Sequence, residues 1–282
     1  MHWRFPPWRP SLLPVLLSFV GEGAQAGELI AKAEKAWKAG ERDKALALAD
    51  EAAKKHPKEA AVFAFRAGLL EQMERYDKAI ADWDAFLALQ PKFALGYQQR
   101  GILYFKAGHI EDSIRDFDRY IEREPKAKVS HWQRGISYYY AGRYADGMAQ
   151  FEGYQEVDSN DVENAVWRFM CQVKKDGLDK ARKDMLKIGA DKRVPMRQIY
   201  DLYLGKMTPE EVLDIAKKTN ADDKEAVSRQ LFYAHLYIGI YQELLGKKKD
   251  SLITPTAPPR ITASATTCGT SPASTGICSK EK

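Results

Sequence analysis

Side chains that commonly perform catalysis or bind metals are few and scattered in this sequence. Its five histidines are His2, His56, His109, His131 and His235. No two of them have the helical spacing of a zinc-binding pair, and the three cysteines also lack metal-ligand spacing. The sequence contains no GxSxG turn, no phosphate-binding glycine-rich loop and no Cys–His nucleophile motif. We therefore predict a non-catalytic protein without a metal site or a cofactor.

Arginines recur in the sequence with a fixed spacing of 34 residues, at Arg66, Arg100 and Arg134. Such a ladder could bind an anion, or each arginine could pair with an acidic residue of the same period. The candidate acids form two sets, Asp82 and Asp116, or Asp84, Asp118 and Glu152. Because the acids share the period of the arginines, we predict structural ion pairs, whose individual contributions to stability are modest.

Several other columns of the sequence repeat with the same period. Small residues directly follow the arginines, and aromatic residues come sixteen positions after the small residues. Glycines and prolines recur at fixed positions of the repeat. The columns are Ala67, Gly101 and Gly135; Trp83, Phe117 and Phe151; Gly108 and Gly142; and Pro57, Pro91 and Pro125. A period of this length is typical of stacked helical hairpins.

Each column has a physical reason in a helical hairpin. The small residue lets the second helix approach the first closely, the glycine ends the first helix, and the proline stops the second helix. Apolar stripes remain on both helices, and one hairpin cannot cover them alone, so neighbouring hairpins stack and share a core. The sequence therefore predicts an all-α fold, a right-handed α–α superhelix of about six hairpins.

These columns, in segments such as QQRGILYFKAGHIEDSIRDFDRYIEREP and WQRGISYYYAGRYADGMAQFEGY, resemble the tetratricopeptide repeat (TPR). The resemblance implies four TPR repeats over residues 27–159 and a degenerate TPR-like helical region over residues 160–252. The chain also resembles bacterial exported TPR proteins of unassigned activity. More distantly it is similar to envelope TPR lipoproteins that act as adaptors, from which it departs by lacking a lipidated cysteine.

Two features are predicted within the degenerate region. Thr208 precedes a proline and two glutamates, which is typical of the residue that caps the start of a helix. A further hairpin is expected to open some twenty residues later. In that hairpin, Gly239 and Gly246 would take the roles of Gly101 and Gly108.

A run of three tyrosines marks the predicted binding surface. In folds of this family, the first helices of the hairpins line the concave surface. The predicted groove residues on these helices are Gln98, Phe105, Lys106, Trp132, Tyr139 and Tyr140. Together they would form an aromatic, partly polar trough that suits a peptide. The alternative is that the C-terminal hairpins fold over these aromatic residues and bury them.

The repeats favour a protein–protein interaction scaffold or adaptor that binds a peptide or protein in the concave groove. One alternative is a small hydrolase-type enzyme with its catalytic unit after residue 194, and another is a purely structural envelope protein. The net charge of +5 comes from interleaved basic and acidic residues rather than from a basic cluster. It therefore does not favour nucleic-acid binding, and nothing in the sequence indicates an oligomeric state.

The N-terminal residues differ from the repeats. Arg4 and Arg9 precede a short apolar stretch that ends before Ala24-Gln25-Ala26. This pattern predicts a secretory signal peptide over residues 1–26, and its apolar stretch is too short to span a membrane. We therefore expect a periplasmic or secreted protein after cleavage near Ala26.

The C-terminal residues 253–282 are rich in threonine, serine and proline and have no helical periodicity. Composition alone favours a genuine disordered tail. However, codons for Pro258 to Thr275, shifted back by one base, permit the helical segment AAEDHRIGHYMWDVARVH, which is like that of the resembling proteins. We predict that the tail is disordered and that it is an out-of-frame translation of the last helix, caused by a missing nucleotide near the codon for Leu252.

Overall fold

The computed structural model describes residues 24–246, with side chains from Ala26 onward. This part of the chain forms thirteen α-helices and one short 3-10 helix, and it contains no strand. The predicted all-α fold is therefore confirmed. The predicted tail at residues 253–282 and nearly all of the predicted signal peptide lie outside the described residues.

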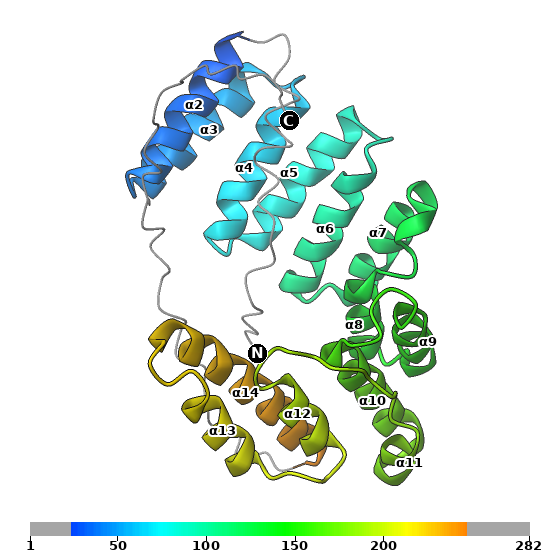
Figure 1. Ribbon diagram of the computed structural model, residues 1–282. Coiled ribbons are helices and arrows are strands. Elements are labelled where there is room, and N and C mark those ends of the chain that lie inside the picture. Colours follow the sequence, from blue (N-terminus) through cyan, green and yellow to red (C-terminus); the bar gives the residue numbers. More distant parts are fainter. Residues whose placement is uncertain (1–23, 247–282) are drawn as a thin grey trace, which may run out of the picture.

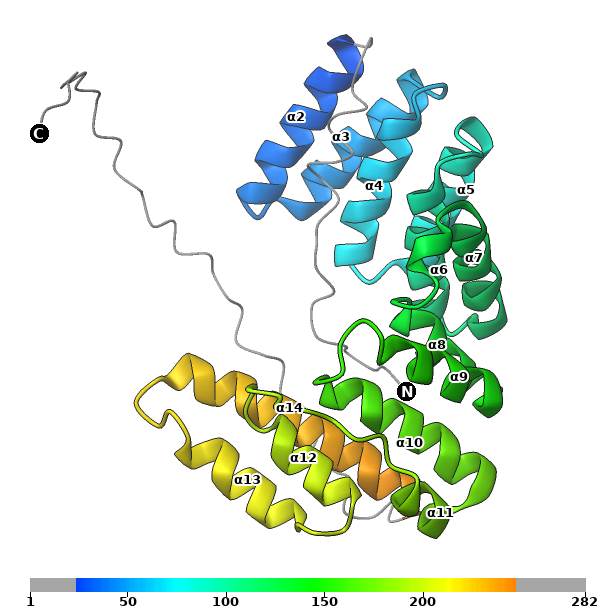
Figure 2. The same cartoon turned by 45° about the vertical axis from the view of Figure 1, so that its right-hand side comes forward.

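Consecutive helices pack as hairpins along a curved, C-shaped stack, with the first helix of each hairpin toward the inner side (Figures 1 and 2). The hairpins are α2 (Ala24–Lys38) with α3 (Arg42–Lys55), α4 (Ala60–Gln72) with α5 (Tyr76–Leu89), α6 (Ala94–Ala107) with α7 (Ile110–Arg123), α8 (Trp132–Tyr140) with α9 (Tyr144–Tyr154), α10 (Val162–Asp176) with α11 (Leu178–Lys183), and α12 (Met196–Tyr203) with α13 (Pro209–Lys218). The 3-10 helix η1 (Pro125–Ala127) lies between α7 and α8, and α14 (Lys224–Leu244) is the last described helix.

The repeated small residues permit close packing within the hairpins. A Cβ added at Gly101 would lie 2.7 Å from the ring of Phe117, and one added at Gly135 would lie 2.6 Å from the ring of Phe151. Both rings are fully buried. Gly108 ends α6 with a φ of 86°, which a side chain rarely adopts. The predicted roles of these columns are confirmed.

The arginine column forms a ladder of ion pairs along the stack. Arg100 binds the carboxylate of Asp116, on the second helix of its own hairpin, through two nitrogens at 2.6 and 2.8 Å. Its third nitrogen binds Asp84, on the preceding hairpin, at 2.6 Å. Arg66 spans Asp82 and Asp50 in the same way. Each arginine therefore joins two hairpins, and both predicted sets of acids contribute partners.

The ladder continues beyond the four predicted repeats. Arg168 on α10 binds the Glu152 carboxylate at 2.9 Å and donates to the main-chain oxygen of Asp184 at 2.8 Å. These partners lie sixteen residues before and after it, as in the other repeats. The hairpin of α10 and α11 therefore keeps the register of the repeat even though its other columns have changed.

One position of the ladder carries an amide in place of a carboxylate. Gln150 stands where Asp82 and Asp116 stand in the preceding hairpins, and its Oε1 accepts from Arg134 at 2.8 Å. Its Nε2 donates at 2.8 Å to the main-chain oxygen of Lys128, in the segment between η1 and α8. A carboxylate could not donate this bond, so the glutamine fixes the segment that leads into α8.

Helix α10 has ten buried residues, because it packs against α9, α11 and α12. Helix α14 packs against α12 and reaches the start of α10 through the Tyr237 hydroxyl, which donates to Glu163 at 2.6 Å. Between them, the Tyr203 hydroxyl donates to the main-chain oxygen of Tyr237 at 3.0 Å. Thr208 caps α13 in a reciprocal pair with Glu211, so this prediction is confirmed. The inner side of α10 is therefore closed.

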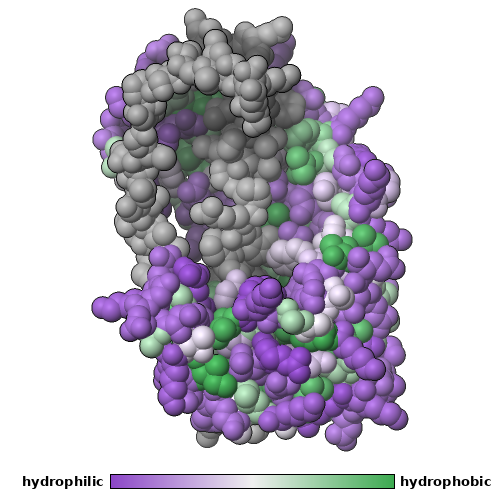
Figure 3. Space-filling view, in the orientation of Figure 1, coloured by the Kyte–Doolittle hydropathy of each residue, from purple (hydrophilic) through white to green (hydrophobic). Residues whose placement is uncertain are grey.

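The surface in the view of Figure 3 is mostly hydrophilic, with hydrophobic side chains in small separate groups over the C-terminal helices. None of the helices between residues 24 and 246 is long and apolar enough to cross a membrane.

Candidate functional site

Five aromatic side chains from neighbouring hairpins meet around helix α8. This α8 cluster consists of Phe105, Tyr139, Tyr140, Tyr144 and Trp167. The ring of Tyr140 lies 5.6 Å from that of Phe105 and 5.3 Å from that of Tyr139, and Tyr139 lies 5.7 Å from Trp167. The rings meet mostly edge to face, a favourable geometry for aromatic pairs.

The cluster is assembled because the stack brings the ends of α6 and α8 next to α10. Phe105 lies in the last turn of α6, Tyr139 and Tyr140 lie in the last turn of α8, and Trp167 lies in the first half of α10. The ion pairs of the arginine ladder join the same hairpins. Phe151 supports the cluster from α9, since its ring stacks on Trp167 at 6.4 Å.

Exposure differs sharply within this region. Phe105 is buried, Tyr139 is half-buried, and Tyr140 is 37% exposed. Trp132, in the first turn of the same helix, is also 37% exposed, and Val129 just before it is 39% exposed. The only other exposed large hydrophobic residues between residues 24 and 246 are Leu89 and Val157. Exposed apolar side chains therefore gather at α8.

The C-terminal end of α14 covers part of the cluster. Leu244 and Leu245 pack in the same hydrophobic core as Tyr139. Burial raises the pKa of Tyr139 and of Tyr140, and the nearby carboxylate of Glu243 raises both further. Tyr139 is therefore half-buried near the end of α14, whereas Tyr140 is 37% exposed.

Three of the predicted groove residues are engaged within the protein. Phe105 is a core residue. Lys106 forms an ion pair with Glu71 on the preceding hairpin at 2.7 Å. The amide oxygen of Gln98 lies 2.5 Å from Nε2 of His131. Burial keeps Phe105 from contacting a ligand directly, whereas the groove role of Lys106 and Gln98 stays a prediction.

His131 has a structural role that combines packing and helix capping. Its Nδ1 accepts a hydrogen bond from the main-chain N–H of Arg134, so the neutral ring carries its proton on Nε2 and donates to Gln98. The ring also packs 4.6 Å from Phe117. The ring therefore packs in the core and caps the helix, and the capping role was not predicted because histidine is an uncommon cap.

Three residues of the site were missed in the sequence, namely Tyr144, Trp167 and Glu243. Trp167 and Glu243 lie in segments where the repeat pattern is weak, and their approach to Tyr139 depends on how α10 and α14 pack. The residue one period before Trp167 is Gln133, so no repeated aromatic column pointed to Trp167.

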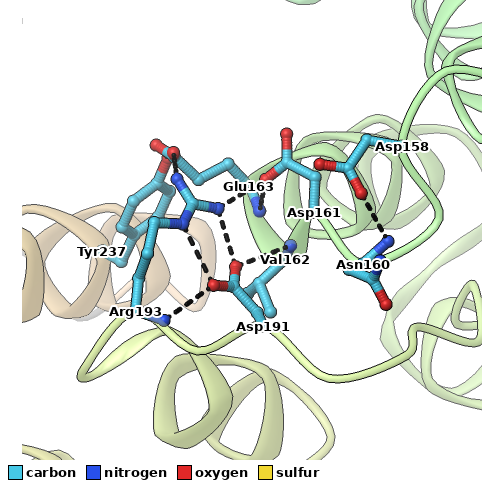
Figure 4. Close-up of polar contacts among 8 residues, drawn as sticks. All are labelled: Asp158, Asn160, Asp161, Val162, Glu163, Asp191, Arg193 and Tyr237. Carbon is cyan, nitrogen blue, oxygen red and sulfur yellow. Dashed lines mark hydrogen bonds and ion pairs between the residues drawn. The ribbon is translucent and has the colours of Figure 1, made fainter. Parts of the chain in front are cut away.

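A separate group of polar residues holds the segment between α11 and α12 against the start of α10. Arg193 binds Asp191 at 2.7 Å, Glu163 at 2.7 Å and Asp161 at 2.8 Å, and Tyr237 donates to Glu163 from the other side (Figure 4). Burial favours the neutral acid at Asp191, but hydrogen bonds from Arg193 dominate and lower its pKa. One guanidinium binds three carboxylates at once, which suits a structural clamp.

A half-open cavity of about 340 Å³ lies beside this clamp. Its lining residues are Arg193, Val194, Met196, Asn220, Ala226, Arg229, Gln230 and Tyr233. Arg193 is bound by the three carboxylates described above, and Arg229 pairs with Glu225 at 3.0 Å. Across residues 24–246, no group of three His, Cys, Asp or Glu side chains is placed to hold a metal ion.

Comparison with known families and structures identifies the repeats. Two family models described as "Tetratricopeptide repeat" match residues 30–94 and 70–132. A comparison with curated protein sequences gave no significant match.

Several solved structures share the fold. A tetratricopeptide repeat protein from Parabacteroides merdae is 16% identical, with 83% of this chain and 95% of that chain covered and a TM-score of 0.55. A structure of MamA protein is 15% identical, with 72% and 97% covered and a TM-score of 0.53. A MamA fragment from Desulfovibrio magneticus RS-1 is 16% identical, with 57% and 91% covered and a TM-score of 0.51.

Proposed function

Because the chain belongs to the tetratricopeptide repeat proteins, we propose that it is a non-catalytic scaffold that binds a peptide or a protein segment on the inner side of its helical stack. The observation that carries the proposal is the gathering of exposed apolar side chains at α8, namely Val129, Trp132 and Tyr140. Aromatic side chains held rigid by their neighbours lose little conformational entropy on binding, so they are effective anchors.

The packing around Tyr140 supports this role. Three aromatic neighbours and the start of the following turn fix its ring, yet more than a third of the residue is exposed. Contact between an apolar ring and water is unfavourable, so a partner that covers the ring gains binding free energy. The ladder arginines face the second helices and are engaged in ion pairs, so an apolar contact rather than an anion site is the anchor.

Replacing Tyr140 with alanine is expected to weaken peptide binding at least tenfold, equivalent to about 1.4 kcal/mol. The probe is the peptide most enriched when a random dodecapeptide library is selected on the immobilised protein, and its affinity is measured by calorimetry. Val157→Ala is the control, because Val157 is an exposed apolar residue outside α8, three residues after α9 ends. Equal affinity of the two variants, or no enrichment at all, would contradict the proposal.

We further propose that the protein is exported and that residues 1–26 are removed. The basic, apolar and small-residue segments of the N-terminus support this. Mass spectrometry of protein recovered from the envelope of a bacterial host is expected to show Gly27 as the first residue, whereas retention of Met1 would exclude cleavage. Ala26 is buried in the first turn of α2, so cleavage must precede the packing of that turn.

A further inference from the structure

The end of α14 places a carboxylate beside the exposed ring of Tyr140. Glu243 lies in the last turn of α14 and is exposed. The two residues that follow it, Leu244 and Leu245, pack in the same hydrophobic core as Tyr139. Burial is the main cause that raises the pKa of Tyr139 and of Tyr140, and the negative charge of Glu243 raises both further. The carboxylate of Glu243 is therefore close to both tyrosines of the α8 cluster.

The carboxylate of Glu243 differs from those of the arginine ladder in having no counter-ion. Asp84 and Asp116 each bind Arg100 at 2.6 Å. Within residues 24–246, no basic side chain forms an ion pair with Glu243. An exposed acid needs no partner, so this alone does not define a site. The open ring beside it is a separate observation, and together the two leave a negative charge and an aromatic ring available to a ligand.

Basic side chains around Tyr140 do not cancel this negative charge. Lys106, one period before Tyr140, is bound to Glu71 at 2.7 Å. Lys174, one period after Tyr140, is exposed, but the charged group that shifts the pKa of Tyr140 is Glu243. Because interactions between charges weaken with distance, the charge that acts most strongly at the ring is negative.

The same helix already holds one cation between an aromatic ring and a carboxylate. The guanidinium of Arg143 lies 4.5 Å from the centre of the Tyr138 ring and binds Asp146 at 2.8 Å. The face of a tyrosine ring attracts a cation, and the carboxylate adds an ion pair. Tyr140 and Glu243 provide the ring and the carboxylate without the cation.

We propose that the ring of Tyr140 and the carboxylate of Glu243 form a subsite for a lysine or arginine side chain of the segment that binds at α8. This inference rests on the proposed binding role of α8 and adds a charge preference to it. Trp132 and Val129, which are 37% and 39% exposed, remain for apolar side chains of the same segment. The preferred partner therefore combines a basic residue with apolar neighbours.

Selection of peptides on charge variants tests this preference. A random dodecapeptide library is selected on the immobilised protein, on Glu243→Gln and on Glu243→Lys. On the original protein, lysine and arginine are expected to be enriched at least twofold over the starting library. The preference is expected to disappear on Glu243→Gln and to change to aspartate and glutamate on Glu243→Lys. Glu156→Gln is the matched control, because it removes the same charge from an exposed residue two positions after α9 ends, and it should keep the preference.

The outcomes separate this subsite from the proposed function. Enriched peptides that lose affinity for Tyr140→Ala but carry no excess of lysine and arginine would overturn the subsite and leave the binding role of α8 intact. The same basic preference on Glu243→Gln, or an acidic preference on the original protein, would overturn the subsite in the same way. Failure to enrich any peptide, or peptides insensitive to Tyr140→Ala, would remove the proposed function and the subsite together.

Calorimetry with the most enriched peptide locates the contact. Replacing its basic residue with norleucine, which keeps an aliphatic chain without the charge, is expected to weaken binding to the original protein about tenfold and to Glu243→Gln less than about twofold. Tyr140→Phe keeps the ring and is expected to bind like the original protein, whereas Tyr140→Leu is expected to bind about threefold more weakly. Equal effects of norleucine on the original protein and Glu243→Gln, or equal affinities of the two Tyr140 variants, would overturn the subsite.

Discussion

Replacing Arg100 with alanine is expected to lower the free energy of unfolding by about 3–5 kcal/mol, the usual cost of leaving a buried partner charge uncompensated. Asp116, its partner, is 3% exposed and would lose two hydrogen bonds at 2.6 and 2.8 Å. Arg119 lies 3.6 Å from Asp116 but is half-exposed, so it replaces little of the lost interaction. Chemical unfolding of the two proteins measures the difference.

Two further arginine variants make this experiment specific. Arg115→Ala removes an exposed arginine of the same hairpin, which pairs with Asp112 on its own helix. The free energy of unfolding is expected to change by less than about 0.5 kcal/mol. Arg100→Lys keeps the charge but loses the forked geometry, so its cost should lie between the two. If Arg100→Ala cost no more than Arg115→Ala, the ladder would not hold adjacent hairpins together.

Acidification is expected to destabilise the protein through His131. Burial, followed by the positive charge of Arg134, lowers the pKa of His131 from 6.5 to about 3. Between these values the unfolded chain binds a proton that the folded chain does not, so stability falls as the pH drops below 6.5. At pH 5 the loss from this residue is about 2 kcal/mol relative to pH 7.5. Urea unfolding at the two pH values measures it.

His131→Asn is the informative variant for this effect. Asparagine can still accept the hydrogen bond from the Arg134 N–H, but it does not titrate and packs less well against Phe117 and Tyr120. It is expected to be less stable at pH 7.5 and to lose less stability on acidification. His109→Asn, at an exposed histidine, should keep the full pH dependence. A parallel fall in the His131→Asn variant and the original protein would contradict this origin.

The fold was largely predictable because the same packing requirement recurs in each repeat of the sequence. Gly101 and Gly135 are small because Phe117 and Phe151 lie against them, and this contact is local within one hairpin. The arginine ladder was predictable for the same reason, since partners sixteen residues away share the period. Where a column changes, as at Gln150, the sequence alone did not reveal that the amide had taken a different partner.

The candidate site was predicted only in part. Trp132 and Tyr140 were identified correctly as exposed aromatic residues of the inner helix. Gln98 and Lys106 were assigned to the groove because their position in the repeat faces inward, and the structure adds that each bonds to the adjacent hairpin. Their orientation depends on the partner that the next hairpin offers, which the repeat pattern does not specify.

The sequence by itself determined that the chain is a stack of helical hairpins, where the hairpins turn and which arginines tie them together. These features depend on contacts between residues at fixed short separations, so one-dimensional periodicity records them. Only the tertiary structure decided that α12 packs on α10 and α14 on α12, and that Tyr139 is half-buried while Tyr140 is 37% exposed. Those outcomes arise from contacts between segments without a common period, whose geometry is set by the cumulative curvature of the stack.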